Sequence, residues 1–585
     1  MSRILSTTIE TSLNQWVEHF QLNQYSGGKL QIWTFNDKIS RHCIEHELRN
    51  LGFDAEVNSA YKPLVHFFLE KLNEASTPFE CVTIEYPIHP STSTKRFLLE
   101  AYPLAAMIKA NKVNFIASET SSDHYQVVIT DVSRNTARYS VFAPNTLRCD
   151  AMETEQLSPT SWITFTDAQK NVVHHLPFVS DYEQTFITIM QSIKQHEWPS
   201  QSPYFQRLEL NIKVPVQDEP LGYEHEVISL KEALHEDLYF SIQEYFKWRE
   251  GKDATARDCQ PGQIVPVITD STDERYHIDI ELKPYSISSE THEREALERA
   301  TRPISVEQVN AELLALGGQA VKAPTVTGNT VNARYFRGSD RPILVTGGQH
   351  ANESTGVVGA LRAAKRLLAS ETAHLVLSPL DNPDGYAQYQ AFIKDNPLHM
   401  HHAARYTALG DDLEYRHVAP FYEKEIRQQA AMTGAQLHVN LHGYPCHEWT
   451  RPFSGYVPQG FDMWTIPKGF FLVIRHSHQG DWPQFAERFI DAVTRELQVC
   501  TDVIEMNRQQ IALYEQHAGE TGFRMINGFP CFVSGVDNPD FPLHLITEYP
   551  DETIYGDDFI QGHETQMETV LAAYRIFQAM TSAEC

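Results

Sequence analysis

The sequence predicts an α/β protein in which residues 301–585 form a mixed, mainly parallel sheet with helices on both faces. In this part of the chain, short apolar runs alternate with amphipathic helical stretches. That alternation is typical of a sheet covered by helices on both sides. Turn residues such as Asn382-Pro383-Asp384-Gly385 separate the runs. The 585 residues are also too many for one ordinary domain.

Hydrophobic periodicity predicts the elements of this C-terminal part in order. Residues 342–347 form an apolar run that ends at two glycines, and a helical pattern covers residues 354–368. Further strands are expected at residues 374–378, 436–441, 470–475 and 543–547, and further helices at residues 422–433, 482–499 and 559–580. Sheets of this kind bind ligands at the carboxyl ends of their strands.

Residues 1–300 are expected to hold smaller α/β or α+β domains: residues 1–200 form an N-terminal domain of unknown role, and residues 201–300 a small domain and linker. Strands are expected at residues 30–35, 82–86, 113–118, 125–132, 137–142, 207–214, 263–268 and 276–282, and helices at residues 37–51, 61–72, 95–110 and 229–248. The last of these helices has an amphipathic pattern. The charged run at residues 290–302 predicts a surface helix or linker before the last domain.

Composition narrows the class of protein. With 48 Lys and Arg against 76 Asp and Glu, the net charge of −28 disfavours nucleic acid and anionic membrane surfaces as partners. Eight scattered cysteines without a CxxC pair predict reduced thiols in a cytoplasm. No basic-then-apolar N-terminus and no apolar window of about 18 residues is present, so neither a signal peptide nor a transmembrane helix is expected.

A histidine and a carboxylate stand at the first strand-to-helix corner of the C-terminal part. His350 and Glu353 follow the strand at residues 342–347 and precede the helix at residues 354–368. Imidazole nitrogen and carboxylate oxygen are both good zinc ligands. A catalytic zinc site needs three protein ligands and one open position, so a third ligand must come from another part of the chain.

Two more polar residues fall at predicted strand ends. His442 ends the strand that begins at residue 436, and Glu548 ends the strand that begins at residue 543. Because the carboxyl ends of parallel strands meet at one edge of a sheet, these residues are expected near His350 and Glu353. His438 and His447 compete with His442 as the third ligand. A structural carboxylate paired with an arginine is the alternative for Glu548.

Four stretches together resemble the zinc carboxypeptidase family, the metallocarboxypeptidases. They are Gly347-Gly348-Gln349-His350-Ala351-Asn352-Glu353, Asn382-Pro383-Asp384-Gly385-Tyr386, Leu441-His442-Gly443-Tyr444 and Thr547-Glu548. Their order matches the family, and the resemblance covers residues 304–580. It implies a zinc carboxypeptidase-like fold in which His350, Glu353 and His442 hold one Zn²⁺ per chain. It also implies that Glu548 is the general base, which takes a proton from a zinc-activated water and delivers it to the leaving amine.

The residues expected to bind the substrate differ from the family pattern. The resemblance implies one arginine that polarises the scissile carbonyl and an Asn-Arg pair that binds a substrate carboxylate. Arg405 and Arg416 lie at suitable distances after the Asn-Pro-Asp-Gly turn, but Leu413-Glu414-Tyr415-Arg416 lacks the asparagine. We therefore expect Arg405 at the carbonyl and Arg416 at the carboxylate. Tyr415, Asn382 and Arg451 complete the predicted substrate-binding set, and a surface salt bridge is the alternative for each arginine.

The sequence thus predicts a zinc-dependent metallopeptidase of the metallocarboxypeptidase type that hydrolyses a peptide or amide bond. A zinc amide hydrolase acting on N-acyl amino acids, of the aspartoacylase or succinylglutamate desuccinylase type, is the first alternative. A non-catalytic binding protein on the same fold is the second. The N-terminal domains could restrict access to the site or build a homo-oligomer.

Overall fold

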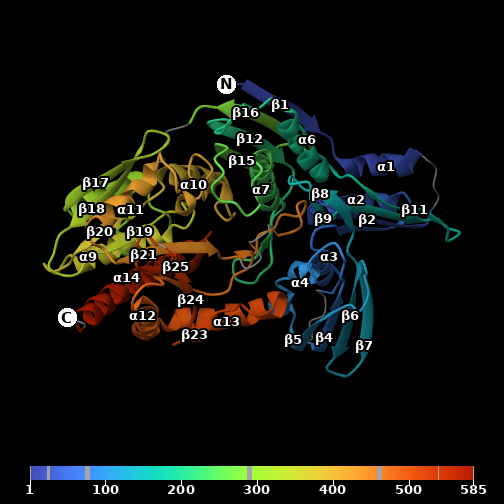
Figure 1. Cartoon of the computed structure of the whole chain (residues 1–585). Coiled ribbons are helices and arrows are strands. Elements are labelled where there is room, and N and C mark those ends of the chain that lie inside the picture. The colour runs from blue at the N-terminus through green and yellow to red at the C-terminus, as the bar shows by residue number, and fades with distance from the viewer. Residues whose placement is uncertain are drawn as a thin grey trace.

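The computed structural model describes residues 2–22, 27–72, 79–285, 293–457, 461, 464–537 and 539–583 (Figure 1). The C-terminal part is built on a nine-stranded sheet with the order β17-β18-β20-β19-β21-β25-β22-β24-β23. Its strands are β17 (Gln319–Pro324), β18 (Thr330–Phe336), β19 (Ile343–Gly347), β20 (Leu375–Ser378), β21 (Leu437–Pro445), β22 (Phe471–Ser477), β23 (Arg524–Ile526), β24 (Phe529–Val536) and β25 (Leu543–Glu552).

Parallel pairing is concentrated at the centre of this sheet. The strands β20, β19, β21 and β25 run parallel to one another, and so do β22 and β24. The remaining neighbours pair antiparallel. The predicted mixed α/β sheet is confirmed.

Helices cover both faces of the sheet. Leu344 in β19 packs with Ala430 of α11 (Glu425–Ala431) on one face. Its neighbour Val345 points to the opposite face, because successive strand side chains alternate. There α9 (Thr355–Leu367) packs on β19 and β21, and α14 (Asp557–Ala583) packs on α9 and β25. The other helices of this part are α8 (Val306–Ala315), α10 (Pro383–Asp395), α12 (Trp482–Glu496) and α13 (Thr501–Ala518).

The strands that carry His442 and Glu548 are longer than the sequence pattern predicts. The strand β19 stops at Gly347, opposite Leu441 of β21. Beyond that point β21 and β25 continue as a pair, with His442 opposite Glu548 and Tyr444 opposite Pro550. Both site residues therefore lie inside their strands and not at their ends. They still flank the carboxyl end of β19, where His350 follows.

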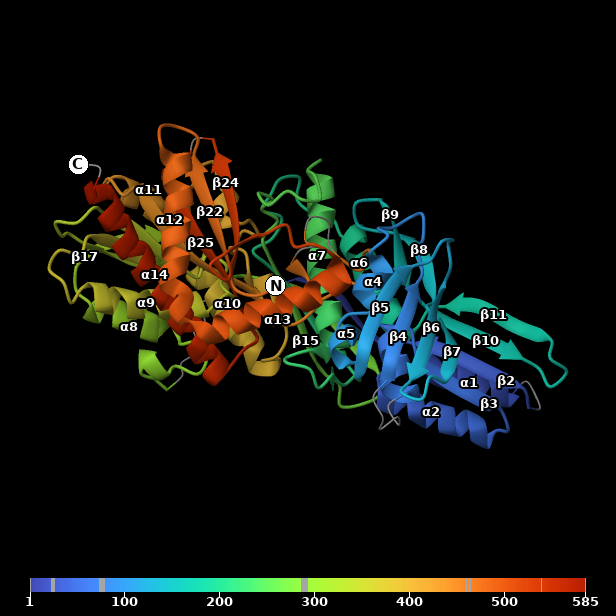
Figure 2. The ribbon, with the colours of Figure 1, turned by 90° about the horizontal axis from the view of Figure 1, so that it is seen from below.

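The N-terminal part contains several smaller sheets, and those that contain β2 to β7 lie at the opposite end of the molecule from β17 and α8 in Figure 2. Two four-stranded sheets are β5-β4-β6-β7 and β11-β10-β2-β3. Their strands are β2 (Lys29–Thr34), β3 (Asp54–Ser59), β4 (Phe79–Tyr86), β5 (Ala110–Ala117), β6 (His124–Asp131), β7 (Thr136–Phe142), β10 (Ser161–Thr166) and β11 (Val172–Phe178). A third sheet joins β1 (Ser2–Ile9) to β16 (Tyr276–Lys283), β12 (Arg207–Val214) and β15 (Gln263–Asp270). Two short pairs are β8 (Asn145–Cys149) with β9 (Glu155–Pro159) and β13 (Glu219–Pro220) with β14 (Val227–Ile228).

Helices of this part are α1 (Ser12–Leu22), α2 (Lys38–Asn50), α3 (Pro63–His66), α4 (Arg96–Glu100), α5 (Leu104–Met107), α6 (Asp181–Gln195) and α7 (Leu230–Arg249). The single helix expected at residues 95–110 is wrong: Pro103 separates α4 from α5, and β5 begins at Ala110. Proline lacks an N–H group and blocks a continuous helix. Part of the charged run at residues 290–302 lies outside the described residues, and its described end holds only a short 3-10 turn at Leu297–Arg299.

The helix α7 is predicted from its sequence as an amphipathic helix, and the structure buries it on every side. All residues from Leu230 to Lys247 are buried. Figure 1 shows α7 between the N-terminal sheets and the large C-terminal sheet. Its acidic side chains are buried because loops of the C-terminal part supply partners for them, such as Arg451 for Glu244 and His402 for Glu236.

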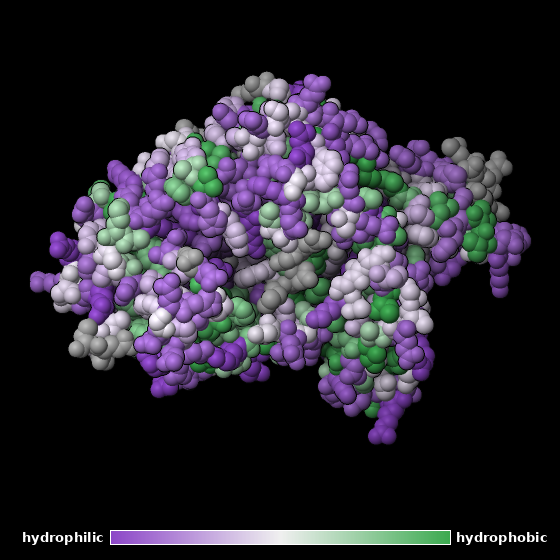
Figure 3. All heavy atoms as spheres, in the orientation of Figure 1, coloured by the Kyte–Doolittle hydropathy of each residue, from purple (hydrophilic) through white to green (hydrophobic). Residues whose placement is uncertain are grey.

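In the described part of the chain, no helix combines the length and the apolar character needed to cross a membrane. On the face shown in Figure 3, hydrophilic and hydrophobic residues are interspersed, and hydrophilic residues predominate.

Candidate metal centre

A tight turn after β19 brings His350 and Glu353 to the sheet edge. Gly348 has a φ of +59°, which a residue with a side chain rarely adopts. A Cβ atom at Gly348 would also lie 2.7 Å from Cδ1 of Leu380. The chain can therefore leave β19 sharply, pass through His350 and Glu353, and enter α9 at Thr355.

The side chains of His350, Glu353 and His442 converge on one point, as the sequence predicts. Nδ1 of His350 lies 2.8 Å from Oε1 of Glu353, and Nδ1 of His442 lies 2.8 Å from Oε2 of the same carboxylate. The two Nδ1 atoms are 3.0 Å apart. All three side chains are buried, and one ligand atom from each lies within 4.8 Å of the others.

The arrangement of these atoms fits a zinc ion. Nε2 of His350 lies 3.4 Å from Oδ2 of Asp412, so its N–H can donate there and leave the Nδ1 lone pair free for a metal. Gln349 donates to the other oxygen of Asp412 at 3.2 Å and holds that carboxylate in place. Two imidazole nitrogens and one carboxylate form a ligand set that catalytic zinc sites use.

A second cluster with metal-ligand chemistry, His66, Glu70 and Glu219, lies in the N-terminal part. Here Arg41 donates to both oxygens of Glu70, at 2.6 and 3.0 Å. A guanidinium group that already neutralises the carboxylate competes directly with a cation. This cluster does not fit a metal ion.

The charges around Glu353 stabilise its ionised form. Burial alone would raise the pKa of this carboxyl, but His350, Arg405 and His442 together hold it well below its usual range. Arg405 donates from NH1 to Oε1 of Glu353 at 2.7 Å. A carboxylate that stays ionised is able to bind a metal cation at any ordinary pH.

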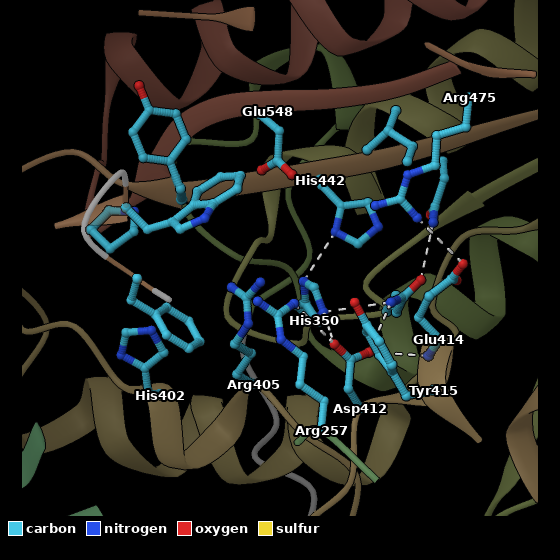
Figure 4. Close-up of a pocket in the computed structure, with 17 residues that line it drawn as sticks. Arg257, His350, His402, Arg405, Asp412, Glu414, Tyr415, His442, Arg475 and Glu548 are labelled. Carbon is cyan, nitrogen blue, oxygen red and sulfur yellow. Dashed lines mark hydrogen bonds and ion pairs between the residues drawn. The ribbon is translucent and has the colours of Figure 1, made fainter. Parts of the chain in front are cut away.

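A cavity of about 100 Å³ opens onto His350, His442 and Arg405 (Figure 4). His350, His442, Arg405, Tyr415 and Glu548 all line it, as the sequence prediction requires of a shared site. Further lining residues are Arg257, Gln349, His402, Asp412, Glu414, Asn440, Tyr444, Pro445, Phe461, Trp464, Arg475 and Ile546.

Glu548 faces the cavity from β25 and is buried. Among the described residues, no hydrogen-bond partner reaches its Oε2 atom. Burial, and after it the charge of Glu353, raises the pKa of Glu548 well above that of an ordinary glutamate. The predicted alternative, a structural carboxylate in an arginine salt bridge, has no counterpart in the ion pairs of the described residues.

Arg416 lies in a buried ion-pair network of its own. Its guanidinium donates to Asp411 at 2.6 and 2.9 Å and to Thr407 at 2.8 Å, and it also contacts Glu423. These partners use its donors and shield it from a substrate. The predicted carboxylate contact by Arg416 therefore has no support in the position of its side chain.

Arg451 and Asn382 also have structural partners. Arg451 is fully buried and donates to both oxygens of Glu244, at 2.6 and 2.8 Å. Asn382 accepts from the N–H of Gly385 at 2.9 Å, which caps α10, and donates to the carbonyl of Tyr406 at 3.1 Å. Asn382 thus fixes the segment that carries Arg405 and does not reach the cavity itself.

The two competing histidines are placed elsewhere. Nε2 of His438 lies 2.8 Å from the hydroxyl of Thr346, and Nε2 of His447 lies 2.8 Å from Oε2 of Glu232. Neither belongs to the converging group of His350, Glu353 and His442.

Two cavity arginines were not predicted from the sequence. Arg257 comes from the loop after α7, outside the stretch that resembles the family, and its guanidinium lies 5.5 Å from the ring centre of Tyr415. Its backbone carbonyl accepts from the N–H of Asp412 at 2.8 Å, which ties the loop to the site. Arg475 reaches the cavity from β22 and approaches Glu414 at 3.8 Å. Sequence spacing offers no signal for either contact.

The acidic side chains of α7 hold cavity loops from behind. Glu236 binds the ring and the backbone N–H of His402, with Oε2 2.5 Å from Nδ1 and Oε1 3.3 Å from the amide nitrogen. Burial lowers the pKa of His402 well below its usual value. The N-terminal part therefore forms one side of the site.

Comparison with known proteins finds solved structures that resemble this chain, but no family model and no curated protein that its sequence matches. The chain is similar to a solved metallo-carboxypeptidase from Burkholderia cenocepacia, with 13% identity and a TM-score of 0.30 over 52% of this chain and 77% of that one. A metallo-carboxypeptidase from Pseudomonas aeruginosa has 15% identity and a TM-score of 0.29 over 53% of this chain and 73% of that one. Carboxypeptidase A from Helicoverpa armigera has 11% identity and a TM-score of 0.30 over 52% and 83% of the two chains. At these values the likeness does not bear on activity, and the chemistry of the cavity follows from its own side chains.

Proposed function

We propose that this protein is a zinc-dependent hydrolase of peptide or amide bonds, of the metallocarboxypeptidase type. One observation carries the proposal: His350 and His442, which converge with Glu353 on one point, line a cavity together with Glu548 and Arg405. Zinc, when bound there, would polarise a carbonyl and lower the pKa of water toward neutrality.

Glu548 is the general base in this proposal. Its carboxylate lies in the cavity with a raised pKa, so it can take a proton from an attacking water near neutral pH. The protonated form can then give the proton to the leaving amine. The absence of a hydrogen-bond partner on Oε2, among the described residues, leaves that oxygen available for both transfers.

Arg405 and Arg257 act on the substrate in this proposal. Arg405 keeps one guanidinium nitrogen on Glu353 and lines the cavity, so it can stabilise negative charge that develops on the scissile carbonyl oxygen. Arg257 replaces Arg416 as the candidate for a substrate carboxylate. Its nearest acid, Asp412, is 3.8 Å away, which leaves its fork of donors largely unused.

The size of the cavity favours a second candidate, an amide hydrolase for small N-acyl amino acids. A volume of about 100 Å³ is below the ~300–1,000 Å³ of typical ligand pockets. A small N-acyl amino acid needs less volume than an extended peptide. Both candidates use the same ligands and the same base.

A digestion experiment separates the candidates. Zinc-loaded protein is incubated with a peptide library and with a panel of N-acyl amino acids, and the products are identified by mass spectrometry. We expect peptides shortened from the C-terminus, and no product with Glu548→Gln or after chelation. Release of acyl groups without peptide cleavage would establish the second candidate. No product from either set would contradict both and favour a non-catalytic binding protein.

A further inference from the structure

Arg475 lines the cavity from β22 with a guanidinium group whose donors are unused (Figure 4). Its Nη1 atom lies 3.8 Å from Oε1 of Glu414, which is too far for a hydrogen bond. The other oxygen of Glu414, Oε2, lies 2.6 Å from Nη1 of Arg427. Glu414 therefore has a closer cationic partner than Arg475. In the described part of the chain, Arg475 has no partner at hydrogen-bond distance.

Arg257 presents a second guanidinium group from the loop after α7. Its Nη1 atom lies 3.8 Å from Oδ2 of Asp412, and its guanidinium carbon lies 5.2 Å from the ring centre of Phe461 and 5.5 Å from that of Tyr415. The two rings hold the group in place by cation–π attraction. Asp412 itself accepts a hydrogen bond from Gln349 at 3.2 Å. Among the described residues, the cavity thus has two arginines, on separate elements, that no carboxylate of its wall binds at hydrogen-bond distance.

The pairing of β22 with β25 places Arg475 on the same face of the sheet as Glu548. Phe471 lies opposite Glu548 and Arg475 lies opposite His544 in this antiparallel pair, with Ile546 between them on β25. Side chains two residues apart share a face, and Glu548, Ile546 and Arg475 all line the cavity. Four residues at ~3.3 Å each separate the two ends by about 13 Å along the strand. The cavity floor therefore changes from a carboxylate, through an apolar side chain, to a cation.

A substrate side chain with an apolar stem and an acidic end matches this floor. The methylene groups of a glutamate side chain would cover Ile546, and its carboxylate would meet the donors of Arg475 in the planar geometry that a guanidinium group favours. A basic side chain would be repelled there. An uncharged side chain would displace water from Arg475 without replacing its hydrogen bonds, which is unfavourable.

We propose that Arg475 is a specificity-determining residue that selects substrates whose leaving residue carries an acidic side chain, with glutamate as the best fit. This inference rests on the proposed function, in which Arg257 binds the α-carboxylate of that same residue. It applies equally to a peptide that ends in glutamate and to an N-acyl glutamate, because both release the same amine.

Binding of free amino acids tests the inference without any turnover. Glutamate and glutamine are titrated into the zinc-loaded full chain in a calorimeter. We expect glutamate to bind ~10–100-fold more tightly, as a charge-assisted hydrogen bond predicts, and Arg475→Gln to abolish this preference. Arg524→Gln is the matched control: Arg524 lies on β23 of the same sheet, is paired with Glu487 at 2.5 Å and does not line the cavity. Its preference should equal that of wild type.

A charge reversal adds a result that misfolding cannot imitate. In Arg475→Glu, free lysine should bind more tightly than glutamate, because the end of the floor would then be acidic. Equal affinities of wild type for glutamate and glutamine would overturn the inference. An unchanged preference in Arg475→Gln would also overturn it and would leave Arg475 as a partly exposed arginine beside Glu414.

Kinetics distinguish a failure of this inference from a failure of the proposed function. Substrates that differ only in a leaving glutamate or glutamine should differ ~10–100-fold in kcat/KM with wild type and should become equal with Arg475→Gln. Hydrolysis of both at the same rate would overturn the selection by Arg475 and leave the proposed function intact. Selective binding of glutamate without hydrolysis of either substrate would instead contradict the proposed function and support the acidic subsite.

Discussion

The substitution Glu548→Gln removes the proposed base while it keeps the shape of the side chain. The new amide could not accept a proton from water, but it would occupy the same place on β25. General acid–base help is typically worth ~10²–10⁴-fold, and one residue that serves both proton transfers should lie near the upper end. We therefore expect kcat to fall by about 10⁴-fold, which corresponds to ~5 kcal/mol of activation free energy.

Zinc content and KM separate this result from the loss of a ligand. Glu548 is not part of the converging group of His350, Glu353 and His442, so the variant should keep its zinc. KM should stay within a few-fold of wild type, because the change affects a proton transfer and not a ground-state contact. Glu448→Gln is the matched control: Glu448 is a buried carboxylate bound to Lys62, away from the cavity residues, and its substitution should leave kcat within a few-fold.

The role of Glu548 as the base also predicts the direction in which the rate changes with pH. Burial and Glu353 raise the pKa of Glu548, so the carboxylate needed as a base is lost as pH falls through that raised value. The wild-type rate should decline at a higher pH than an ordinary glutamate would cause. Loss of zinc from Glu548→Gln, or activity near that of wild type, would refute the role of Glu548 as the base.

Three further substitutions test the arginines. Arg257→Ala should raise KM by ~10–100-fold for substrates with a free carboxylate, as expected for a charged hydrogen bond, and should leave KM for carboxamide analogues unchanged; equal effects on both substrates would exclude the carboxylate contact. Arg405→Ala should lower kcat by ~10²–10³-fold, and a change confined to KM would instead place Arg405 at a ground-state contact. Arg451→Met should lower the free energy of unfolding by ~3–5 kcal/mol in a denaturant titration, because Glu244 would remain buried without its partner. If the Arg451→Met protein is as stable as wild type but has a raised KM, the result would instead indicate that Arg451 binds the substrate.

Local patterns were enough to predict the centre of the fold. The apolar run before His350, the two glycines and the following helix are consecutive in sequence, and the structure forms them as β19, a tight turn and α9. The strand ends could not be predicted as well. The extension of β21 and β25 past His442 and Glu548 depends on their pairing with each other, and that pairing joins residues about a hundred positions apart.

Long-range contacts explain what the sequence could not reveal about the site. An amphipathic pattern in α7 does not reveal that the helix is buried on every side, because the partners of its acids, His402 and Arg451, lie 166 and 207 residues away in the chain. Asp411 and Asp412 are adjacent in sequence, yet one binds Arg416 and the other supports His350. Spacing alone does not distinguish two such neighbours. Arg257 reaches the cavity only because its loop docks on the segment that carries Asp412.

Zinc content of purified variants tests the central claim most directly. Wild-type protein should hold about one zinc ion per chain, and alanine substitution of His350, Glu353 or His442 should each reduce zinc content nearly to zero, because two remaining ligands hold the ion poorly. His438→Gln and His447→Gln should keep full zinc, since both side chains have other partners. Full zinc occupancy in His442→Ala, or zinc loss in His438→Gln, would contradict the account.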